Sequence, residues 1–449
     1  MKEWAPLEAE AYKDLYRSAQ SGNYDIYVVF VERGLGFLNR KGHLGFILPN
    51  KFFTAKYGEN LRALIAEHGH LEHVVHFGDQ QVFTGATTYT ALLFLSKVLS
   101  ESVLWAEADD LSAWRIAGRA TTGEVPTEKI TRAEWHFSVG TGASIFERLS
   151  EMPVKLGDVA ERIFQGLVTG ADGVFVVHNT GKQRFFSDAT KQEHRIEPEL
   201  MHPLCKGSVD LRRYHVTPLV KSILFPYKLT EEGAKLISPH EFQGSHPLAW
   251  EYLNINRQLL ESRERGKWKH DRWYAFGRSQ NLGEMEQRKI LTPSIAIRSS
   301  FTLDVDDYFY FLGSGGGGGG GYGITLRSDC RLSYEFVLGL LNSRLLDTYL
   351  KATSSPFRGG YFAYNRQYIE RLPIRIIDFS QAADRARHDK MVSLVERMLE
   401  LHRRRQAAES EGERELLQRQ IDSTDREIDA LVYELYGLSD EEVRMVEGK

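Results

Sequence analysis

The sequence has few cysteines and no long apolar run. Its 449 residues include only Cys205 and Cys330, too few for a disulfide framework or a four-ligand zinc site, so we expect both to be small buried residues. No apolar run reaches the roughly 18 residues that a membrane-spanning helix needs. The first residues are acidic and amphipathic, unlike a signal peptide. We therefore predict a cytoplasmic protein with no membrane span.

Motifs for several kinds of catalysis are also absent. The sequence contains no H-E-x-x-H, no G-x-S-x-G and no P-D…E-x-K pattern of the restriction-nuclease kind. His68, His70, His73 and His76 lie close together, but no carboxylate-and-histidine pattern completes a metal site around them. We interpret them as surface or sheet-edge histidines and predict no metal site.

Length and composition indicate a globular protein with more than one core. A chain of 449 residues is long for one core and suggests two or three domains, while 42% hydrophobic residues is an ordinary proportion. The formal net charge of −4 argues against nucleic-acid binding by the chain as a whole. Local charge patterning therefore has to decide whether any segment suits such a partner.

One segment, 256–300, is strongly basic. Ten basic residues stand there against five acidic ones, a local excess of five positive charges. Aromatic residues lie among these charges or just before them: Trp250, Tyr252, Trp268, Trp273, Tyr274 and Phe276. This pattern suits a surface that contacts phosphates and stacks on bases; the alternative is a solvated helix face with its aromatic side chains turned into a core. The candidate DNA contacts are Arg263, Arg265, Lys267, Lys269, Arg272 and Arg298.

The N-terminal part predicts alternating helices and strands. Apolar spacing predicts a helix from Tyr27 to Leu38 and a second from Asn60 to His68. An apolar run without alternation, Gly42 to Pro49, predicts a strand covered on both faces, and Leu71 to Phe77 and Tyr89 to Leu95 predict two more strands. This order is typical of an α/β sheet of parallel type closed by a late hairpin.

Pro49 and Asn50 end the first of these strands. They should lie at the carboxyl edge of the sheet, where open α/β folds bind their ligands. We therefore take both as candidate site residues, with a simple strand stop as the alternative.

Several sequence motifs in this region resemble those of a known protein family. The patterns D-x-Y-x-x-F-x-E, G-x-L-G-F-I-L-P-N-K-F, L-R and F-G-D-x-x-V-F-T-G-A-T-T-Y-T-A lie between Asp25 and Ser96. They resemble the later catalytic-domain motifs of adenine-specific DNA methyltransferases of the gamma-type motif order, the group with a TaqI-like specificity domain. In that family an Asn-Pro-Pro-Tyr motif and a Gly-rich cofactor motif stand upstream, and this sequence contains neither. The resemblance implies S-adenosylmethionine as cofactor of the complete enzyme, with no cofactor-binding residues here.

The resemblance also assigns a role to Phe83. In V-F-T-G-A-T-T this residue falls where the family places an aromatic ring that stacks on the target base after the base is flipped out of the duplex. The alternative is an ordinary core phenylalanine at a strand edge. Gly85, Thr87 and Thr88 give Phe83 a polar, turning neighbourhood, which favours the stacking role.

A second region, roughly 154–374, resembles a TaqI-like target-recognition domain. Its opening, KLGDVAERIFQGLVTGADGVFVV, contains three glycine turns, from which Gln165 and Thr169 could reach outward to DNA. Further matches are L-C-K-G from Leu204, L-F-P-Y from Leu224 and L-P-I from Leu372. The stretch before it, from Leu99 to Trp135, is polar and irregular and predicts a linker.

The C-terminal part predicts a helical hairpin. From Ala382 the apolar positions repeat at helical spacing, pause at the polar residues Ala407 to Gly412 and resume to Tyr436. Gly437 then predicts a helix stop, and the following residues predict a new helix N-terminus. The ending resembles that of type IIG restriction-modification enzymes and their BREX-like relatives.

Together these patterns predict a partial Rossmann-like α/β methyltransferase sheet (1–112), a linker (113–152), an α+β target-recognition domain (153–376) and a helical hairpin (377–449). The first functional hypothesis is the C-terminal half of an adenine-specific DNA methyltransferase of a restriction-modification or phage-defence system. It would bind double-stranded DNA and depend for activity on a separately encoded N-terminal half with the cofactor and catalytic motifs. The alternatives are a non-catalytic DNA-specificity subunit and a truncated, inactive fragment.

Overall fold

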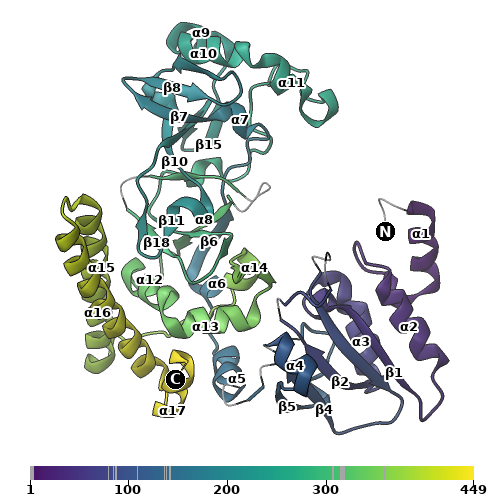
Figure 1. Cartoon of the computed structure of the whole chain (residues 1–449). Coiled ribbons are helices and arrows are strands. Elements are labelled where there is room, and N and C mark those ends of the chain that lie inside the picture. Colours follow the sequence, from purple (N-terminus) through teal and green to yellow (C-terminus); the bar gives the residue numbers. More distant parts are fainter. Residues whose placement is uncertain are drawn as a thin grey trace. The chain divides into compact units, whose positions relative to one another are not determined.

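The computed structural model describes residues 5–78, 80–83, 85, 88–108, 110–135, 137, 139–140, 143–305, 308–313, 319–357 and 359–448. The chain divides into two compact units. The first contains Met1–Glu151, Lys351–Gly360 and Ser439–Lys449, and the second contains Met152–Leu350 and Tyr361–Leu438. Each unit is described by itself (Figure 1).

The first unit is built on one mixed sheet in the order β1-β3-β2-β4-β5. Its strands are β1 (His43–Pro49), β2 (Leu71–His76), β3 (Thr90–Ser96), β4 (Ser102–Glu107) and β5 (Thr121–Pro126). β3 runs antiparallel to both β1 and β2, β4 runs parallel to β2, and β5 runs antiparallel to β4. Consequently β1, β2 and β4 share one direction, and their carboxyl ends meet at one edge of the sheet.

Helices cover the two faces of this sheet unequally. The helices of this unit are α1 (Pro6–Leu15), α2 (Tyr27–Phe37), α3 (Glu59–Glu67), α4 (Leu111–Ala117), α5 (Ala143–Glu151) and α17 (Asp440–Glu447). Short 3-10 turns are η1 (Arg17–Ala19), η2 (Asn50–Phe53), η3 (Lys56–Gly58) and η4 (Thr127–Lys129). Residues of α2 and α3 share the main core with Val74 of β2, whereas the next residue, Val75, belongs to a smaller cluster against α4. Neighbouring strand residues point to opposite faces, so the two clusters mark the two sides of the sheet.

The elements predicted between Tyr27 and Ser96 are present, but two expectations for this unit were wrong. β1 is an edge strand with alternating exposure, and Ile47 is 43% exposed, so β1 is not covered on both faces. β3 forms the predicted late hairpin with β2 and also pairs antiparallel with β1, which makes the sheet mixed. The stretch predicted as a linker contributes β5 and a buried Trp135 to this unit. The polar edge strand lacks the apolar alternation that would have revealed it.

The second unit contains two larger sheets and several small ones. The six-stranded sheet has the order β19-β10-β13-β7-β8-β9 and the four-stranded sheet the order β18-β16-β20-β6. Their strands are β6 (Ala160–Gln165), β7 (Val176–Gly181), β8 (Arg184–Ser187), β9 (Gln192–Arg195), β10 (Met201–Cys205), β13 (Lys221–Leu224), β16 (Lys289–Pro293), β18 (Thr302–Asp304), β19 (Tyr310–Phe311) and β20 (Gly321–Leu326). The small pairings join β11 (Leu211–Arg212) to β12 (His215–Val216), β14 (Tyr227–Thr230) to β15 (Gly233–Leu236), and β17 (Ile295–Ala296) to β22 (Tyr361–Ala363).

Helices of the second unit lie between the strands and after them. They are α6 (Leu156–Val159), α7 (Asp172–Phe175), α8 (Gly207–Asp210), α9 (Pro239–Ser245), α10 (Pro247–Ile255), α11 (Arg257–Gly266), α12 (Tyr334–Asn342) and α14 (Arg366–Ile369). The predicted C-terminal hairpin is present as α15 (Ala382–Ala407) and α16 (Glu411–Tyr436), which pack side by side (Figure 1). Gly437 ends α16 in the left-handed conformation, as its position predicted.

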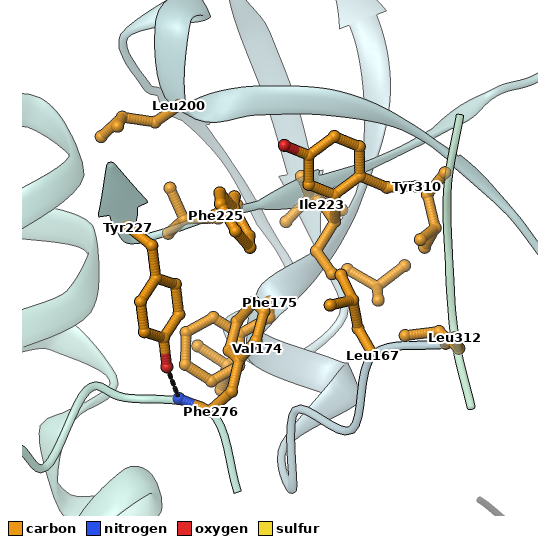
Figure 2. Close-up of a cluster of buried hydrophobic side chains, with 14 of the residues drawn as sticks. Leu167, Val174, Phe175, Leu200, Ile223, Phe225, Tyr227, Phe276, Tyr310 and Leu312 are labelled. Atoms are coloured by element: carbon orange, nitrogen blue, oxygen red, sulfur yellow. Dashed lines mark hydrogen bonds between the residues drawn. The ribbon is translucent and has the colours of Figure 1, made fainter. Parts of the chain in front are cut away.

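The core of the second unit draws aromatic residues from distant parts of the chain. Phe175, Phe225, Tyr227, Phe276 and Tyr310 are buried in one cluster. The Tyr227 hydroxyl accepts a hydrogen bond from the Phe276 backbone N–H at 2.7 Å (Figure 2). This cluster fixes the ends of the loops that carry most of the predicted DNA contacts.

The described part of the chain contains neither a membrane-spanning helix nor a metal-binding cluster. No helix there is long and apolar enough to cross a membrane. No group of three or more histidine, cysteine, aspartate or glutamate side chains could hold a metal ion. Of the clustered histidines, His73 stacks on Phe94 with ring centroids 5.2 Å apart.

Candidate functional site

The carboxyl edge of the first unit's sheet brings Asn50 and His76 together. Asn50 directly follows β1, and its side-chain Nδ2 donates a hydrogen bond to Nε2 of His76, at the end of β2, over 3.0 Å. The Asn50 backbone N–H donates to the carbonyl of Tyr89 at 3.1 Å, and Pro49 pairs with Thr90. Asn50 is therefore held by both its backbone and its side chain at the edge where its position predicted it.

A buried arginine shapes the turn that follows Asn50. The Arg62 guanidinium donates to the carbonyls of Phe52 at 2.5 Å, Ala55 at 3.0 Å and Arg132 at 3.0 Å. Burial lowers the pKa of Arg62. Sequence reasoning noted only the L-R pattern here, because a buried and an exposed arginine look the same in a sequence.

Hydrogen bonds hold Gln80 and Val82, in the loop that leaves β2 at this edge. Gln80 Oε1 accepts from the backbone N–H of Leu111 at 2.5 Å, and Arg115 donates to the carbonyl of Val82 at 2.7 Å. Phe83 comes next and is 47% exposed, so it is not an ordinary core phenylalanine of this unit. Thr84, Ala86 and Thr87, which include part of its predicted polar neighbourhood, lie outside the described residues. Stacking on a base stays a prediction for Phe83.

In the second unit, Thr169 faces inward. Its side chain is fully buried, its Oγ1 donates to the carboxylate of Asp172, and the same oxygen accepts from the backbone N–H of Ala171 at 3.0 Å. The prediction that Thr169 reaches outward to DNA was therefore wrong. Gln165 is half-buried and is the last residue of β6, where it pairs with Tyr322.

Arg263 is a second correction. It is 8% exposed and donates to four backbone carbonyls: Leu260 at 2.8 Å, Thr169 at 3.0 Å, Ala275 at 3.0 Å and Trp273 at 2.6 Å. The guanidinium carbon lies 4.0 Å from the ring centroid of Trp268, and burial lowers the pKa of Arg263 to about 10. A side chain whose donors are used in this way is not available to a phosphate.

The segment Glu264–Arg272, called the basic loop below, carries the exposed charges. Arg265, Lys267, Lys269 and Arg272 are all exposed. Within the described ranges none of the four forms an ion pair with a carboxylate. Arg298, further along, is also exposed. The basic loop therefore offers four cations to a polyanion.

Other members of the basic segment serve the fold. Lys289 and Asp304 form a fully buried ion pair at 2.5 Å. Tyr252, Trp273, Tyr274 and Phe276 are core residues, as in the alternative interpretation of the aromatic pattern. The segment thus combines a packed base with an exposed charged loop.

Comparison with known protein families finds two matches. Residues 1–83 match the Eco57I restriction-modification methylase family, and residues 245–374 match the TaqI-like C-terminal specificity domain. The second match contains the whole basic loop.

Individual relatives come from restriction-modification systems. The type II restriction enzyme and methyltransferase RM.Eco57I of Escherichia coli is 26% identical over 98% of this chain and 45% of its own length. The type II methyltransferase M.XhoI of Xanthomonas vasicola is 24% identical over 81% of this chain and 63% of its own length. The chain thus spans about half to two thirds of the length of these relatives. The type IIL restriction-modification enzyme MmeI, solved in complex with DNA, shares the fold, with a TM-score of 0.60 at 12% identity over 98% of this chain and 54% of that chain.

Proposed function

Since the chain is a relative of the Eco57I-type restriction-modification methylases with a TaqI-like C-terminal specificity domain, we propose that it recognises DNA for an adenine-specific methyltransferase and forms one edge of the pocket for the target base. The observation that carries this proposal is the basic loop. Its four exposed cations are not paired with carboxylates among the residues that the structure describes. Cations of this kind neutralise phosphates and release counterions when a protein binds a duplex.

The edge of the target-base pocket is assigned to Asn50 and Phe83. Asn50 is fixed at the carboxyl edge of the sheet, and Phe83 follows the fixed part of the loop that leaves the same edge. A half-exposed ring at this position offers a π-face to an extruded base. Pro49 ends the strand that presents Asn50 and has no separate chemical role in this proposal.

S-adenosylmethionine is the cofactor that the family resemblance implies. The residues present do not fit it as a binding site of their own. β1 is followed directly by η2, whose Phe52 and Phe53 are buried, and the loop after β2 is tied to α4. A Gly-rich turn between a strand and a helix, which holds such cofactors in α/β folds, is absent from the sequence.

We propose that a second polypeptide segment supplies the cofactor site and the Asn-Pro-Pro-Tyr motif. In the described part of the first unit no strand pairs with the outer edge of β1, and an unpaired edge can accept another strand. Phe30 and Phe37 of α2 and Ile47 of β1 are exposed, as apolar side chains at an interface are before the partner binds. The segment is the N-terminal half of a methyltransferase.

The test uses the purified chain with and without that half. The chain alone should neither bind S-adenosylmethionine in calorimetry nor methylate DNA, and addition of an N-terminal methyltransferase half should restore both. Methyl transfer by the isolated chain would overturn this division of labour. The second candidate function is a specificity subunit without catalysis, which the lack of a cofactor-binding turn also favours. Sequence-specific DNA binding with no gain of methylation from such a half would support this second candidate.

A further inference from the structure

One buried arginine joins two loops that are far apart in the sequence. The carbonyls that accept hydrogen bonds from Arg263 belong to Leu260 before the basic loop, Trp273 and Ala275 after it, and Thr169, 94 positions earlier. The same guanidinium therefore closes the base of the basic loop and ties it to the glycine-rich loop Gly166–Asp172, called the 166–172 loop below. The basic loop itself leaves most of its charges exposed.

The backbones of the two loops also touch directly. The backbone N–H of Gly277 donates to the carbonyl of Thr169 at 2.8 Å, and that of Arg278 donates to the carbonyl of Val168 at 3.1 Å. A Cβ atom added to Gly170, which has a φ of +70°, would lie 3.3 Å from Cα of Gly277 and 3.5 Å from Nη1 of Arg263. Glycine at this position is thus needed for the close approach of the two loops.

Both loops are anchored in the same core. Leu167 belongs to the 166–172 loop, Phe175 follows that loop, Phe276 follows the basic loop, and all three are buried in one cluster (Figure 2). The hydrogen bond from the Phe276 backbone to Tyr227 fixes the exit of the basic loop. Neither loop can shift at its base without disturbing this core.

The first residues of the basic loop form a strained kink within the last part of α11. Glu264 and Arg265 have φ values of +48° and +62°, and Gly266 follows at +85°. Left-handed backbone is unfavourable for residues that carry a Cβ atom, and it persists only where surrounding contacts determine it. Arg263, directly before these residues, supplies those contacts.

We propose that Arg263 is a positioning residue, which anchors the DNA-contacting basic loop to the 166–172 loop and so holds it in one fixed orientation. The inference rests on the proposed function, because it assigns separate tasks within the DNA-binding unit. The exposed cations supply affinity for any duplex, since contacts to phosphates carry no sequence information. The Arg263 contacts supply discrimination, since base edges are read only by groups held in a fixed geometry.

Arg263→Lys tests this division. Lysine keeps the positive charge but lacks the planar fork of donors that reaches four carbonyls. The affinity for a duplex selected from a random pool by the wild-type chain should fall tenfold or more relative to a scrambled duplex. The dependence of binding on salt should keep its slope, because no phosphate contact is lost.

Lys267→Gln combined with Lys269→Gln is the matched control. These substitutions remove exposed charges and leave Arg263 in place. Both duplexes should bind more weakly and the salt slope should fall by about 0.9 for each true phosphate contact, with the ratio of the two affinities unchanged. A lower ratio in this control together with an unchanged ratio in Arg263→Lys would reverse the assignment and overturn the inference.

Gly170→Ala approaches the same contact from the other loop and changes no charge. It should lower the ratio as Arg263→Lys does, and it decides the question if Arg263→Lys impairs folding. The ring of Trp268 reports on the arginine: in 5-fluorotryptophan-labelled protein, with its resonance assigned by Trp268→Phe, Arg263→Lys should move that resonance toward its unfolded position.

The two proposals fail in different ways. A folded Arg263→Lys or Gly170→Ala protein with the wild-type ratio of affinities would contradict the positioning role. A wild-type chain that selects no sequence at all would contradict the proposed function instead.

Discussion

The side-chain nitrogen of Asn50 lies 3.0 Å from Nε2 of His76, and the hydrogen bond between them joins the ends of β1 and β2. β3 lies between these two strands in the sheet. The bond therefore spans the width of β3, at the end where β3 begins. The loop that carries Phe83 leaves β2 directly after His76. A fixed polar group and a half-exposed ring therefore belong to the same edge of the sheet.

Phe83→Ala should reduce base flipping without loss of stability. In the enzyme reconstituted with an N-terminal half, it should lower methylation and the fluorescence gain of 2-aminopurine at the target position. Phe83→Trp should keep much of both, because any flat ring can stack on a base. The side chain is 47% exposed, so both variants should melt near the wild-type temperature.

Phe77→Ala is the control for that experiment. Phe77 is 1% exposed, and its truncation should cost about 3–5 kcal/mol of folding stability through the cavity it leaves. If Phe83→Ala lowers the melting temperature as much as Phe77→Ala does, and base flipping per folded molecule is intact, the stacking role of Phe83 is contradicted.

Neutralising the basic loop should flatten the salt dependence of DNA binding. The triple variant Lys267→Gln, Lys269→Gln, Arg272→Gln should lose about 0.9 in slope for each phosphate contact. A matched triple on α15, Arg385→Gln, Lys390→Gln, Arg404→Gln, also removes three exposed charges and should leave the slope unchanged. Fluorescence anisotropy titrations between 50 and 200 mM salt, on the order of the range where such slopes are measured, compare the two. Equal slopes for both triple variants would indicate that the basic loop is a solvated surface that makes no phosphate contacts.

Lys289→Met should destabilise the second unit without affecting its charge-dependent binding. Lys289 and Asp304 are both fully buried and 2.5 Å apart. Removing the lysine leaves a buried carboxylate without its cation, which typically costs about 3–5 kcal/mol. Urea unfolding should show this loss, while the salt slope of the folded fraction should match the wild type. A changed slope at unchanged stability would mean that Lys289 contacts DNA after all.

His402 should make the stability of the second unit depend on pH. Its ring stacks on His215 with centroids 4.4 Å apart, and burial, followed by the charges of His215 and Arg405, lowers the pKa of His402 to about 3. As pH falls below about 6.5, the unfolded chain binds a proton at this residue and the folded chain does not, so stability falls with pH across that window.

The matched variant for this effect is His402→Phe. Between pH 7.5 and pH 5 the wild type should lose about 2 kcal/mol more free energy of unfolding than the variant does. Burial raises the pKa of Asp429 to about 6, which gives the opposite trend, but this contribution is common to both proteins and cancels in the comparison. Equal losses in urea unfolding would show that His402 is protonated in the folded chain.

The local elements could be predicted from the sequence because their signals are local. Apolar spacing predicted α2 within one residue, and Gly437 predicted the end of α16. β5 was missed because its residues are mostly polar and exposed at the sheet edge. The antiparallel direction of β3 was predicted as a late hairpin with β2, whereas its pairing with β1 was not predicted, because apolar spacing does not tell which strands become neighbours.

The site residues divide in the same way. Asn50 lies at the carboxyl edge of the sheet as predicted, because that expectation needs only the strand boundary, and its role in a site stays a prediction. Arg263 and Thr169 were placed wrongly because their burial depends on carbonyl and carboxylate groups that the fold brings to them. The charge of an arginine is visible in a sequence, whereas the number of carbonyls around it is not.

Selection of DNA sequences by the purified chain tests the central claim most directly. Rounds of enrichment from a random duplex pool, followed by sequencing, should recover one short motif that contains adenine, and binding to it should weaken steeply with salt. A pool that stays random, or binding that does not respond to salt, would contradict the account.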